Sequence, residues 1–457
     1  MKVCLVQCPS PLLSEDKVMP PLGILYLAAW LQKHNHEVQI IDLAGSTDWR
    51  ADIIKEKEKI FGARWLGFSC TTPQYNHAKR ISQFVKENFE CYPKMVVGGI
   101  HTTSLSHANE LAFLERDGFD SYVIGEGYNA VTRICEDLAS SQGLNKLYSE
   151  RILKDVNDLP YAARELIDIK SYTYRLGDTP ATTFYSQYGC PYACQYCESP
   201  MAGNWTVRAM TAERIAGEIK HIIDKWGIYG FHFFDDEMNL DRKRMISICE
   251  QLRKVDRLTW RGFVVTAKFD EELARACRLS GCYEVASGLE SGSEKILRNI
   301  RKPSTRSINQ RFVRTAKRAR LRVKGFFIVG LPGESWQTIY ETDKFLQDCK
   351  DEGYPLDDVD FSLLQIYPGS PLYQNPQDIT FSDIDPDKAY YKSSPQGYED
   401  LVQIQTANMT KKDLLAARSW LESRWKPESW MKKYEDRRDY DRVRDNIKFA
   451  EAQLRLI

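Results

Sequence analysis

The sequence carries no net charge, because 63 lysine and arginine residues are matched by 63 aspartate and glutamate residues. Nucleic acid backbones are bound mainly through excess positive charge, so the composition disfavours RNA or DNA as a partner. Long hydrophobic runs are also missing. The longest strongly apolar stretch, from Leu22 to Leu31, falls short of the roughly 20 residues that cross a bilayer. We therefore expect no membrane span.

The N-terminus lacks the charged, apolar and small-residue sections of a signal peptide and runs directly into a strand-like pattern. This predicts a cytoplasmic protein. The 457 residues are enough for about three domains. In a reducing compartment the twelve cysteines are expected to be core thiols or metal ligands, because disulfides seldom persist there.

Short apolar segments alternate with helix-length segments in residues 1–143, which we predict to form one domain. The strand candidates are Val3 to Val6, Glu37 to Asp42, Trp65 to Ser69, Lys94 to Gly98 and Ser121 to Ile124. This repetition predicts an α/β domain with a Rossmann-like, doubly wound parallel sheet. Ligands of such sheets bind at the carboxyl ends of the strands.

A second series of strands follows a predicted linker over residues 144–180. Its six strand candidates are Thr182 to Tyr188, Gly230 to Phe234, Thr259 to Thr266, Tyr283 to Leu289, Val323 to Gly330 and Val359 to Ile366. Six units are too few for a standard eight-unit barrel, so residues 181–369 are predicted to form a partial (β/α)6 barrel. Residues 370–457 are predicted to form a small, mainly helical region that caps the substrate site, with Trp420, Trp425 and Trp430 as packing anchors.

Three cysteines stand close together at the spacing Cx3Cx2C, in the segment Gly189-Cys190-Pro191-Tyr192-Ala193-Cys194-Gln195-Tyr196-Cys197. Buried hydrophobic thiols along one helix face are one interpretation, although Gly189 and Pro191 oppose an uninterrupted helix. A structural zinc is a second, but no nearby His or Cys supplies a fourth ligand at a standard spacing. In the third, three thiolates bind three irons of a four-iron cluster and leave the fourth iron open to a reactant.

The cysteine spacing, with the aromatic Tyr196 just before the last cysteine, resembles the signature of the radical S-adenosylmethionine (SAM) superfamily. The resemblance implies that Cys190, Cys194 and Cys197 hold a [4Fe-4S] cluster whose open iron binds SAM. It also implies reductive cleavage of SAM to a 5'-deoxyadenosyl radical, which takes hydrogen from unactivated carbon.

Three further segments resemble SAM-binding motifs of this superfamily. They are Phe233-Phe234-Asp235-Asp236-Glu237, Gly288-Leu289-Glu290-Ser291-Gly292 and Gly325-Phe326-Phe327-Ile328-Val329-Gly330-Leu331-Pro332-Gly333. The SAM-binding residues that the resemblance implies are Tyr196, Asp235, Asp236, Glu237, Glu290, Ser291, Ile328 and Gly330. The alternative is that these carboxylates cap helices and these glycines form tight turns.

The first domain resembles the cobalamin-binding domain that precedes the radical SAM domain in part of this superfamily. The resemblance rests on the segments Pro20 to Ala28, Ser69 to Thr72, Val97 to His101 and Gly125 to Gly127. The cobalamin-binding residues that it implies are Ser69, Thr71, Thr72, Pro73, Gln74, Tyr75, Gly98, Gly99, Gly125, Glu126 and Gly127. Small residues at strand ends let a nucleotide-like tail approach backbone amides, but many such domains bind another ligand or none.

The Asp-x-His-x-x-Gly pattern that supplies an imidazole to cobalt in other cobalamin proteins is missing. We expect His101 to form local hydrogen bonds rather than to bind cobalt. We hypothesise that the loop Pro73-Gln74-Tyr75 lies beneath the corrin ring.

Together the resemblances imply a cytoplasmic, cobalamin-dependent radical SAM methyltransferase with a [4Fe-4S] cluster, SAM and cobalamin as cofactors. It would transfer a methyl group from methylcobalamin to an unactivated carbon of a small-molecule metabolite or natural product. An external donor such as flavodoxin or ferredoxin would supply electrons. The alternatives are a ring contraction or cyclisation with the same cofactors, a methylthiotransferase, and a non-catalytic iron–sulfur or corrinoid sensor. Substrate, cobalt axial ligand and oligomeric state do not follow from the sequence.

Overall fold

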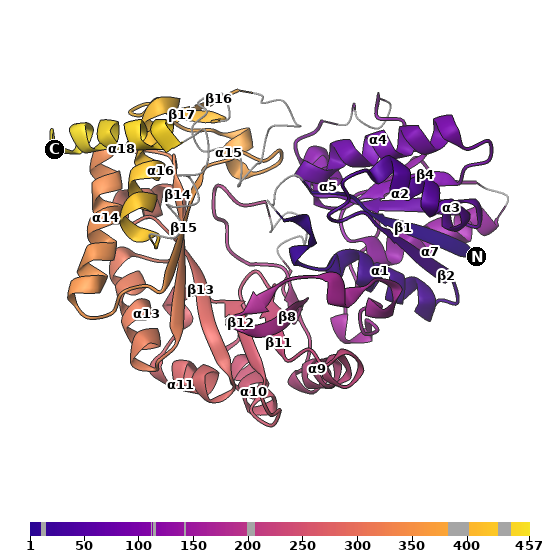
Figure 1. The fold of residues 1–457 in the computed structure, drawn as a ribbon, viewed down its shortest axis with the longest axis horizontal. Helices are drawn as coiled ribbons and strands as arrows, with labels where there is room; N and C mark the ends of the chain where they lie inside the picture. Colours follow the sequence, from indigo (N-terminus) through magenta and orange to yellow (C-terminus); the bar gives the residue numbers. More distant parts are fainter. Residues whose placement is uncertain are drawn as a thin grey trace. The chain divides into compact units, whose positions relative to one another are not determined.

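The computed structural model describes residues 1–10, 15–110, 112, 116–140, 143–198, 206–382, 402–427 and 440–457. The chain forms two compact units (Figure 1). The first comprises Met1–Pro191 and Glu198–Ile228, and the second comprises Tyr192–Cys197 and Tyr229–Ile457. In the described part of the chain, no helix has the length and apolar character needed to cross a membrane.

The first unit contains a six-stranded parallel sheet in the order β2-β1-β3-β4-β5-β6. Its strands are β1 (Lys2–Gln7), β2 (Glu37–Asp42), β3 (Trp65–Ser69), β4 (Lys94–Gly98), β5 (Ser121–Val123) and β6 (Leu147–Tyr148). The central strands are buried along nearly their whole length, as expected for parallel strands covered on both faces. The short strand β6 lies within the segment predicted as a linker.

Helices cover both faces of this sheet (Figure 1). They are α1 (Leu22–Lys33), α2 (Trp49–Lys55), α3 (Lys57–Phe61), α4 (Thr72–Asn88), α5 (Ile100–His107) and α7 (Gly127–Ala139). Helix α1 packs against α7, where the Trp30 indole Nε1 donates to Thr132 Oγ1 over 3.0 Å. Helices α4, α5 and α7 begin within a few residues of the ends of β3, β4 and β5, so their N-termini lie at the carboxyl edge of the sheet.

The first unit also contains short elements that lead toward the cysteine motif. They are the hairpin β7 (Arg175–Leu176) and β8 (Thr179–Phe184), the antiparallel pair β9 (Gln187–Tyr188) and β10 (Arg208–Ala209), and helix α9 (Ala212–Trp226). The single strand predicted from Thr182 to Tyr188 is therefore wrong in its bounds. Strand β8 ends at Phe184. Gln187 and Tyr188 form the separate strand β9, in which Tyr188 pairs with Arg208 of β10.

The second unit contains five parallel strands in the order β15-β14-β13-β12-β11. They are β11 (Gly230–Phe233), β12 (Thr259–Phe263), β13 (Cys282–Glu290), β14 (Arg322–Val329) and β15 (Asp358–Leu363). The predicted strands that extended to Thr266 and Ile366 end earlier, at Phe263 and Leu363. The residues beyond them form loops at the carboxyl edge, where sites of such sheets are built.

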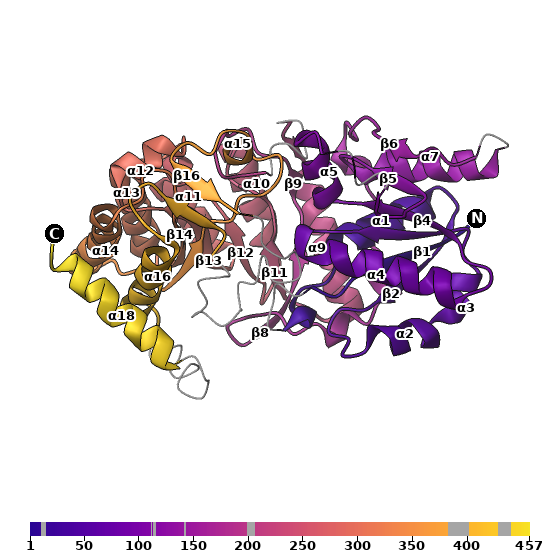
Figure 2. The ribbon, with the colours of Figure 1, turned by 90° about the horizontal axis from the view of Figure 1, so that it is seen from above.

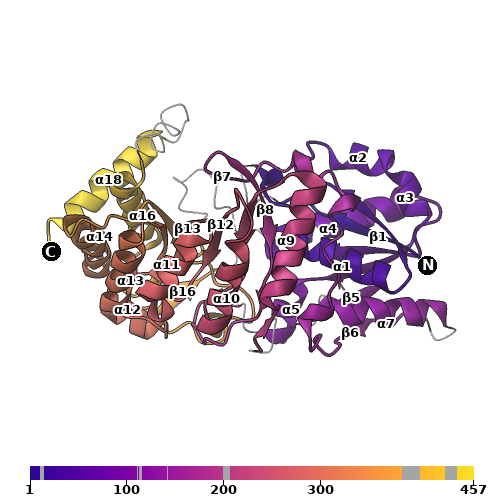
Figure 3. The same cartoon turned by 90° about the horizontal axis from the view of Figure 1, so that it is seen from below.

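Helices line the outer side of these curved strands (Figures 1 and 3). They are α10 (Arg242–Leu252), α11 (Glu271–Leu279), α12 (Glu294–Asn299), α13 (Arg306–Arg318) and α14 (Trp336–Asp351). Side chains alternate along each strand, so apolar residues such as Phe327 pack outward, with its ring 6.2 Å from that of Phe345 on α14.

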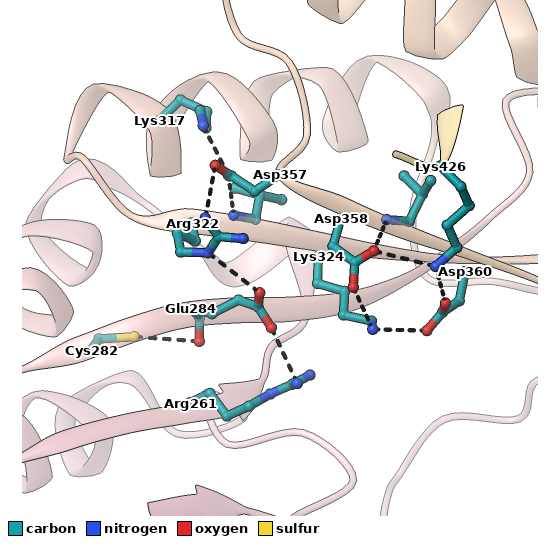
Figure 4. A network of polar contacts seen from close by, with 12 residues as sticks. Arg261, Cys282, Glu284, Lys317, Arg322, Lys324, Asp357, Asp358, Asp360 and Lys426 are labelled. Carbon is teal, nitrogen blue, oxygen red and sulfur yellow. Dashed lines mark hydrogen bonds and ion pairs between the residues drawn. The ribbon is translucent and has the colours of Figure 1, made fainter. Parts of the chain in front are cut away.

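The inward-facing positions of the same strands carry ion pairs near their amino ends (Figure 4). Glu284 pairs with Arg261 at 3.2 Å, and Lys324 pairs with Asp358 at 2.6 Å and with Asp360 at 2.8 Å. The neighbouring lysines hold the pKa of Asp360 low, at about 2, against the effect of burial. Charged groups this deep are tolerated because each has an oppositely charged partner.

The C-terminal elements pack on the last strands of the second unit. They are α15 (Pro371–Gln374), the antiparallel pair β16 (Ile379–Phe381) and β17 (Ile404–Thr406), α16 (Lys411–Trp425) and α18 (Tyr440–Leu454). Helix α16 packs against β15. It also packs against α18, which lies beside it in Figure 2. Trp420 is buried, and the Trp425 indole Nε1 donates to Asp343 Oδ1 over 2.8 Å. Trp430 lies outside the described residues.

The architecture confirms the predicted fold class: a Rossmann-like first sheet, a partial barrel and a helical C-terminal region.

Candidate functional site

A cavity of about 210 Å³ opens at the carboxyl edge of the first sheet. Six of the predicted cobalamin-binding residues line it, and they are Ser69, Gly98, Gly99, Gly125, Glu126 and Gly127. Sites for whole drug-sized ligands have roughly 300–1,000 Å³, so this cavity has room for one part of a large cofactor, such as a nucleotide base. Its wall is mainly apolar, which suits a flat ring.

Gly99 shapes the entrance to this cavity. Its φ of +101° lies in the left-handed region, and a Cβ atom there would lie 2.6 Å from both the backbone N and O of Cys70. Only glycine fits without moving the backbone. The tight turn lets α5 begin at Ile100. Thr103 on that helix donates to the Gly99 carbonyl over 3.0 Å and accepts from the Gly125 N–H over 2.9 Å, which links two cavity loops.

A buried ion pair closes one side of the cavity. Arg208 Nη1 lies 2.6 Å from Glu126 Oε2 and also donates to the Leu153 carbonyl. Burial raises the pKa of Glu126, and the guanidinium of Arg208 opposes that shift. The guanidinium also lies over the ring of Tyr188, another residue of the cavity wall. Arg208 therefore acts within a buried network rather than as a solvated surface charge.

The other five predicted cobalamin residues, Thr71, Thr72, Pro73, Gln74 and Tyr75, begin helix α4 and are not among the residues that line the cavity. Gln74 accepts from the Thr71 N–H over 3.1 Å and donates to the Cys8 carbonyl over 3.1 Å. Tyr75 donates to Asp117 over 3.0 Å. Their role at a corrin stays a prediction.

His101 also lies beside α4. Its Nδ1 is 3.2 Å from Thr72 Oγ1, and its ring packs on that of Tyr75. Burial lowers the pKa of His101 to about 4, so the imidazole is neutral near neutral pH. These contacts are the local hydrogen bonding expected for it.

The cysteine motif begins in the first unit, directly after β9. Gly189 has a φ of +87°, and a Cβ atom there would lie 2.2 Å from the Thr206 carbonyl oxygen. A side chain at this position would force the strand pair β9 and β10 apart. Gly189 therefore fixes the direction in which the chain reaches Cys190.

Cys194 and Cys197 belong to the second unit. The Cys197 N–H donates to the Cys194 carbonyl over 3.2 Å, so the two residues form one tight turn. Gln195 ties this turn to the unit, because its N–H donates to the Ile300 carbonyl over 3.0 Å and its carbonyl accepts from the Leu372 N–H over 2.9 Å. Gly189 and the turn exclude one continuous helix through the motif.

All twelve cysteines are free thiols. Soft thiolates are the ligands that iron–sulfur clusters take, so the donor set of Cys190, Cys194 and Cys197 fits such a cluster. Among the described residues no three His, Cys, Asp or Glu side chains are gathered into a metal-binding arrangement. The three thiols are divided between the two units, and their role as cluster ligands stays a prediction.

A polar cluster lies beside the Cys194–Cys197 turn. The Tyr196 hydroxyl donates to Glu290 Oε1 over 2.7 Å, and Lys302 Nζ donates to the same oxygen over 2.9 Å. Lys302 Nζ is also 3.4 Å from the Tyr196 oxygen. Glu290 ends β13 with a φ of +62° at an irregularity in strand pairing. Such irregularities commonly turn a side chain toward a site.

The acidic motif after β11 places three carboxylates differently. Asp235 is buried, Asp236 is exposed and Glu237 is partly buried. Burial raises the pKa of Glu237 to about 7, and the positive charge of Lys302 opposes that shift. Glu237, Glu290 and Lys302 therefore share one electrostatic environment.

The remaining predicted SAM residues end β13 and β14. The Ser291 hydroxyl contacts Thr342 Oγ1 at 3.2 Å and accepts from the Ser293 N–H, so it organises its own loop. Ile328 is partly exposed at an inward-facing position of β14. Gly330 has a φ of +99°, and its N–H donates to Glu334 Oε2 over 3.2 Å. Contact of these residues with SAM stays a prediction.

Glu334 gives the loop after β14 a testable pH dependence. Burial raises the pKa of Glu334 from 4.5 to about 7. The folded protein binds this proton more tightly than the unfolded chain, so this group costs stability as the pH rises through that window. Glu334→Gln removes the cost. We expect the melting temperature of the variant to rise relative to that of the unsubstituted protein as the pH increases from about 5 to about 8. The gain corresponds to about 2 to 3 kcal/mol in the free energy of unfolding.

The matched control is Glu271→Gln, at an exposed position on α11. Its melting temperature relative to the unsubstituted protein is expected to show no such gain with pH. Equal behaviour of the two variants would contradict the assignment to Glu334.

Gly23 and Lys302 are among the residues of these sites that the sequence did not predict. Gly23 on α1 lines the cavity of the first unit, and Lys302 contacts Tyr196 and Glu290 in the second. Gly23 lies inside a segment that the resemblance included, and a glycine in the first turn of a helix was the available signal. Lys302 carried no signal, because it is one of many lysines.

Comparison with protein families finds two matches. A model described as the radical SAM superfamily matches residues 184–346, and a model described as the B12 binding domain matches residues 14–134.

Several known proteins are similar to this chain over most of its length. An uncharacterized methyltransferase of Pyrococcus horikoshii is 28% identical over 371 residues, which cover 78% of this chain and 78% of the relative. An anaerobic magnesium-protoporphyrin IX monomethyl ester cyclase of Rubrivivax gelatinosus is 24% identical, and the alignment covers 78% of this chain and 66% of that relative. The radical SAM methyltransferase TsrM of Kitasatospora setae, solved with tryptophan and a SAM analogue, aligns with a TM-score of 0.68. That alignment covers 90% of this chain and 85% of TsrM at 16% identity, which shows a shared fold.

Proposed function

Since this chain belongs to the radical SAM superfamily and carries a B12-binding domain ahead of its radical SAM domain, we propose that it methylates an unactivated carbon of a small molecule. The chain is a radical SAM enzyme that uses a [4Fe-4S] cluster, SAM and cobalamin. The proposal adds the reaction. Methyltransferase relatives support it, among them the Pyrococcus horikoshii protein.

One observation supports the proposal more than any other: a single chain holds a cavity at the glycine-rich strand ends of its first sheet and a cysteine motif whose Cys194–Cys197 turn lies beside a polar cluster. Methyl transfer to unactivated carbon needs a methyl donor and a source of substrate radicals. When bound, cobalamin supplies the methyl group, and the cluster with SAM supplies the hydrogen-abstracting radical.

The protein's own residues bind and orient these groups. We assign the cavity around Gly98 and Gly99 to the tail of cobalamin. Gly98 and Gly99 line that cavity, and the Thr103 hydroxyl holds the neighbouring loops in place. In the second unit we assign Cys194 and Cys197, with Cys190, to the cluster. Tyr196, Glu237 and Glu290 then orient SAM through its polar groups.

The proposal also names partners and a division of the chain. We include an external one-electron donor of the flavodoxin or ferredoxin class, and a small-molecule metabolite or natural-product intermediate as substrate. We also propose the domain division predicted from the sequence, with domains over residues 1–143, 181–369 and 370–457 and a linker over 144–180. Residues 370–457 serve as a cap for the substrate.

Anaerobic reconstitution of the full chain with iron, sulfide and cobalamin tests the cofactors and the chemistry together. We expect iron, sulfide and corrinoid in the purified protein. With a strong reductant and SAM labelled with deuterium in its methyl group, we expect 5'-deoxyadenosine, S-adenosylhomocysteine and labelled methylcobalamin. Methylcobalamin formation is the step that methyl transfer requires.

The other outcomes separate the alternatives. Formation of 5'-deoxyadenosine without S-adenosylhomocysteine or methylcobalamin would favour ring contraction or cyclisation, a reaction that the name of the Rubrivivax gelatinosus relative brings into consideration. Bound cofactors without any cleavage of SAM would favour a sensor. With a candidate substrate in hand, a product heavier by one methylene would support methylation.

A further inference from the structure

Lys302 is a buried cation in the second unit to which the sequence assigned no role. It follows helix α12, and its N–H donates to the Leu297 carbonyl over 3.0 Å. Only 11% of its side chain is exposed. The ammonium contacts Glu290 Oε1 at 2.9 Å and the Tyr196 oxygen at 3.4 Å. A lysine buried this far needs such partners, because an unpaired charge is costly away from water.

Glycine at position 288 leaves room for the ion pair between Lys302 and Glu290. A Cβ atom on Gly288 would lie 2.1 Å from Glu290 Oε1 and 2.9 Å from Lys302 Nζ. Any larger residue at Gly288 would therefore displace the ion pair. Glu290 adopts a φ of +62°, a conformation that costs energy for a residue with a side chain. The chain accepts this strain to direct the Glu290 carboxylate at Lys302 and Tyr196.

The charge of Lys302 is fixed rather than switched. Burial acts to lower the pKa of Lys302, but the surrounding acidic groups, Glu290 first among them, together outweigh it and leave that pKa above its ordinary value. Lys302 also lies beside the cysteine turn. Its Nζ is 3.4 Å from the oxygen of Tyr196, which stands between Cys194 and Cys197 in that turn. A positive charge at this place favours negative charge on groups bound at the turn.

We propose that Lys302 is a positioning residue that holds Tyr196 and Glu290 beside the cysteine turn and raises the reduction potential of the cluster bound there. The inference rests on the proposed function. When the cluster accepts one electron from a donor of the flavodoxin or ferredoxin class, its negative charge increases by one and no bond forms or breaks. A permanent cation nearby stabilises the reduced state more than the oxidised state.

The test is a redox titration of the reconstituted full chain without substrate. Electron paramagnetic resonance measures the reduced cluster at each potential. We expect Lys302→Met to shift the midpoint potential to more negative values. Lys302→Arg keeps the charge and is expected to restore the potential toward that of the unsubstituted protein.

Lys426→Met is the matched control. Lys426 is also buried, with 6% of its side chain exposed, and it also bonds two carboxylates, Asp358 and Asp360 (Figure 4). Lys426→Met also removes a paired lysine from the second unit, but Lys426 contacts neither Tyr196 nor Glu290. We expect its cluster potential to match that of the unsubstituted protein. An equal shift in Lys302→Met and Lys426→Met would overturn the proposal.

Glu290→Gln provides a test of opposite sign. It removes the negative charge and leaves Lys302 in place, so the midpoint potential is expected to become more positive. If Lys302→Met fails to retain iron, Glu290→Gln and Lys302→Arg decide the question, and a potential that does not move in Glu290→Gln rejects the proposal. A protein without any cluster before substitution would instead contradict the proposed function.

Discussion

Replacement of Cys190, Cys194 or Cys197 by alanine is expected to reduce the iron and sulfide of the reconstituted protein to background and to abolish formation of 5'-deoxyadenosine. Each thiolate holds one iron of the proposed cluster, so the loss of one leaves two irons without a protein ligand. Iron and sulfide analysis, the absorption spectrum and chromatography of the SAM cleavage products measure the effect. It is the largest single-residue effect that we expect.

Cys91→Ala is the control, because Cys91 is an exposed thiol in the first unit. We expect its iron content and SAM cleavage to match those of the unsubstituted protein.

The iron content of this variant also bears on the methylthiotransferase alternative, which needs a second set of cysteines in the N-terminal region. Cys4, Cys8 and Cys70 are fully buried in the hydrophobic core there. Iron and SAM cleavage that survive in all three motif variants would reject the cluster assignment and the mechanism built on it.

Gly23→Leu is expected to abolish cobalamin binding without unfolding the first unit. Gly23 lines the cavity, and a Cβ atom there would meet nothing within 4 Å. A leucine side chain has space to enter the cavity and fill the volume assigned to the cofactor tail. Leucine is also favoured over glycine in a helix by about 1 kcal/mol, so α1 should not lose stability. Corrinoid content falls to background while the melting temperature of the apoprotein stays the same or rises.

Two further variants calibrate this prediction. Gly23→Ala adds one methyl group and is expected to retain most of the cobalamin. Gly99→Ala places its Cβ atom against the backbone of Cys70 in a left-handed conformation, so we expect a loss of both stability and cobalamin. Unchanged corrinoid content in Gly23→Leu would show that the cofactor tail binds elsewhere.

Local sequence patterns were sufficient for the fold. Parallel strands buried on both faces appear as short apolar runs, and the strands from Trp65 to Ser69 and from Lys94 to Gly98 were predicted with the bounds that the structure has. Bounds failed where strands reach the carboxyl edge. Beyond Phe263 and Leu363 the chain still contains buried apolar residues, but they pack in loops and do not continue the strands. Hydrophobicity reports burial and does not distinguish a strand from a packed loop.

The sites were predicted less completely than the fold. Gly98 and Gly99 were assigned from the resemblance, and both line the cavity. Of the two, Gly99 has the positive φ that favours glycine. Gln74 and Tyr75 were assigned to cobalamin from their place after a strand, and the structure shows both side chains engaged with protein partners instead of lining the cavity. Lys302 could not be recognised, because its significance depends on Glu290 and Tyr196, which are distant in sequence.

The sequence by itself determined that this protein has two α/β parts, three closely spaced thiols and a superfamily resemblance, because periodicity and motif spacing are local properties of the chain. Tertiary structure alone decided that Gly23 faces open space, that Gly288 makes room for an ion pair, and that Lys302 lies beside the cysteine turn. Each of these depends on distances between residues that only folding brings together.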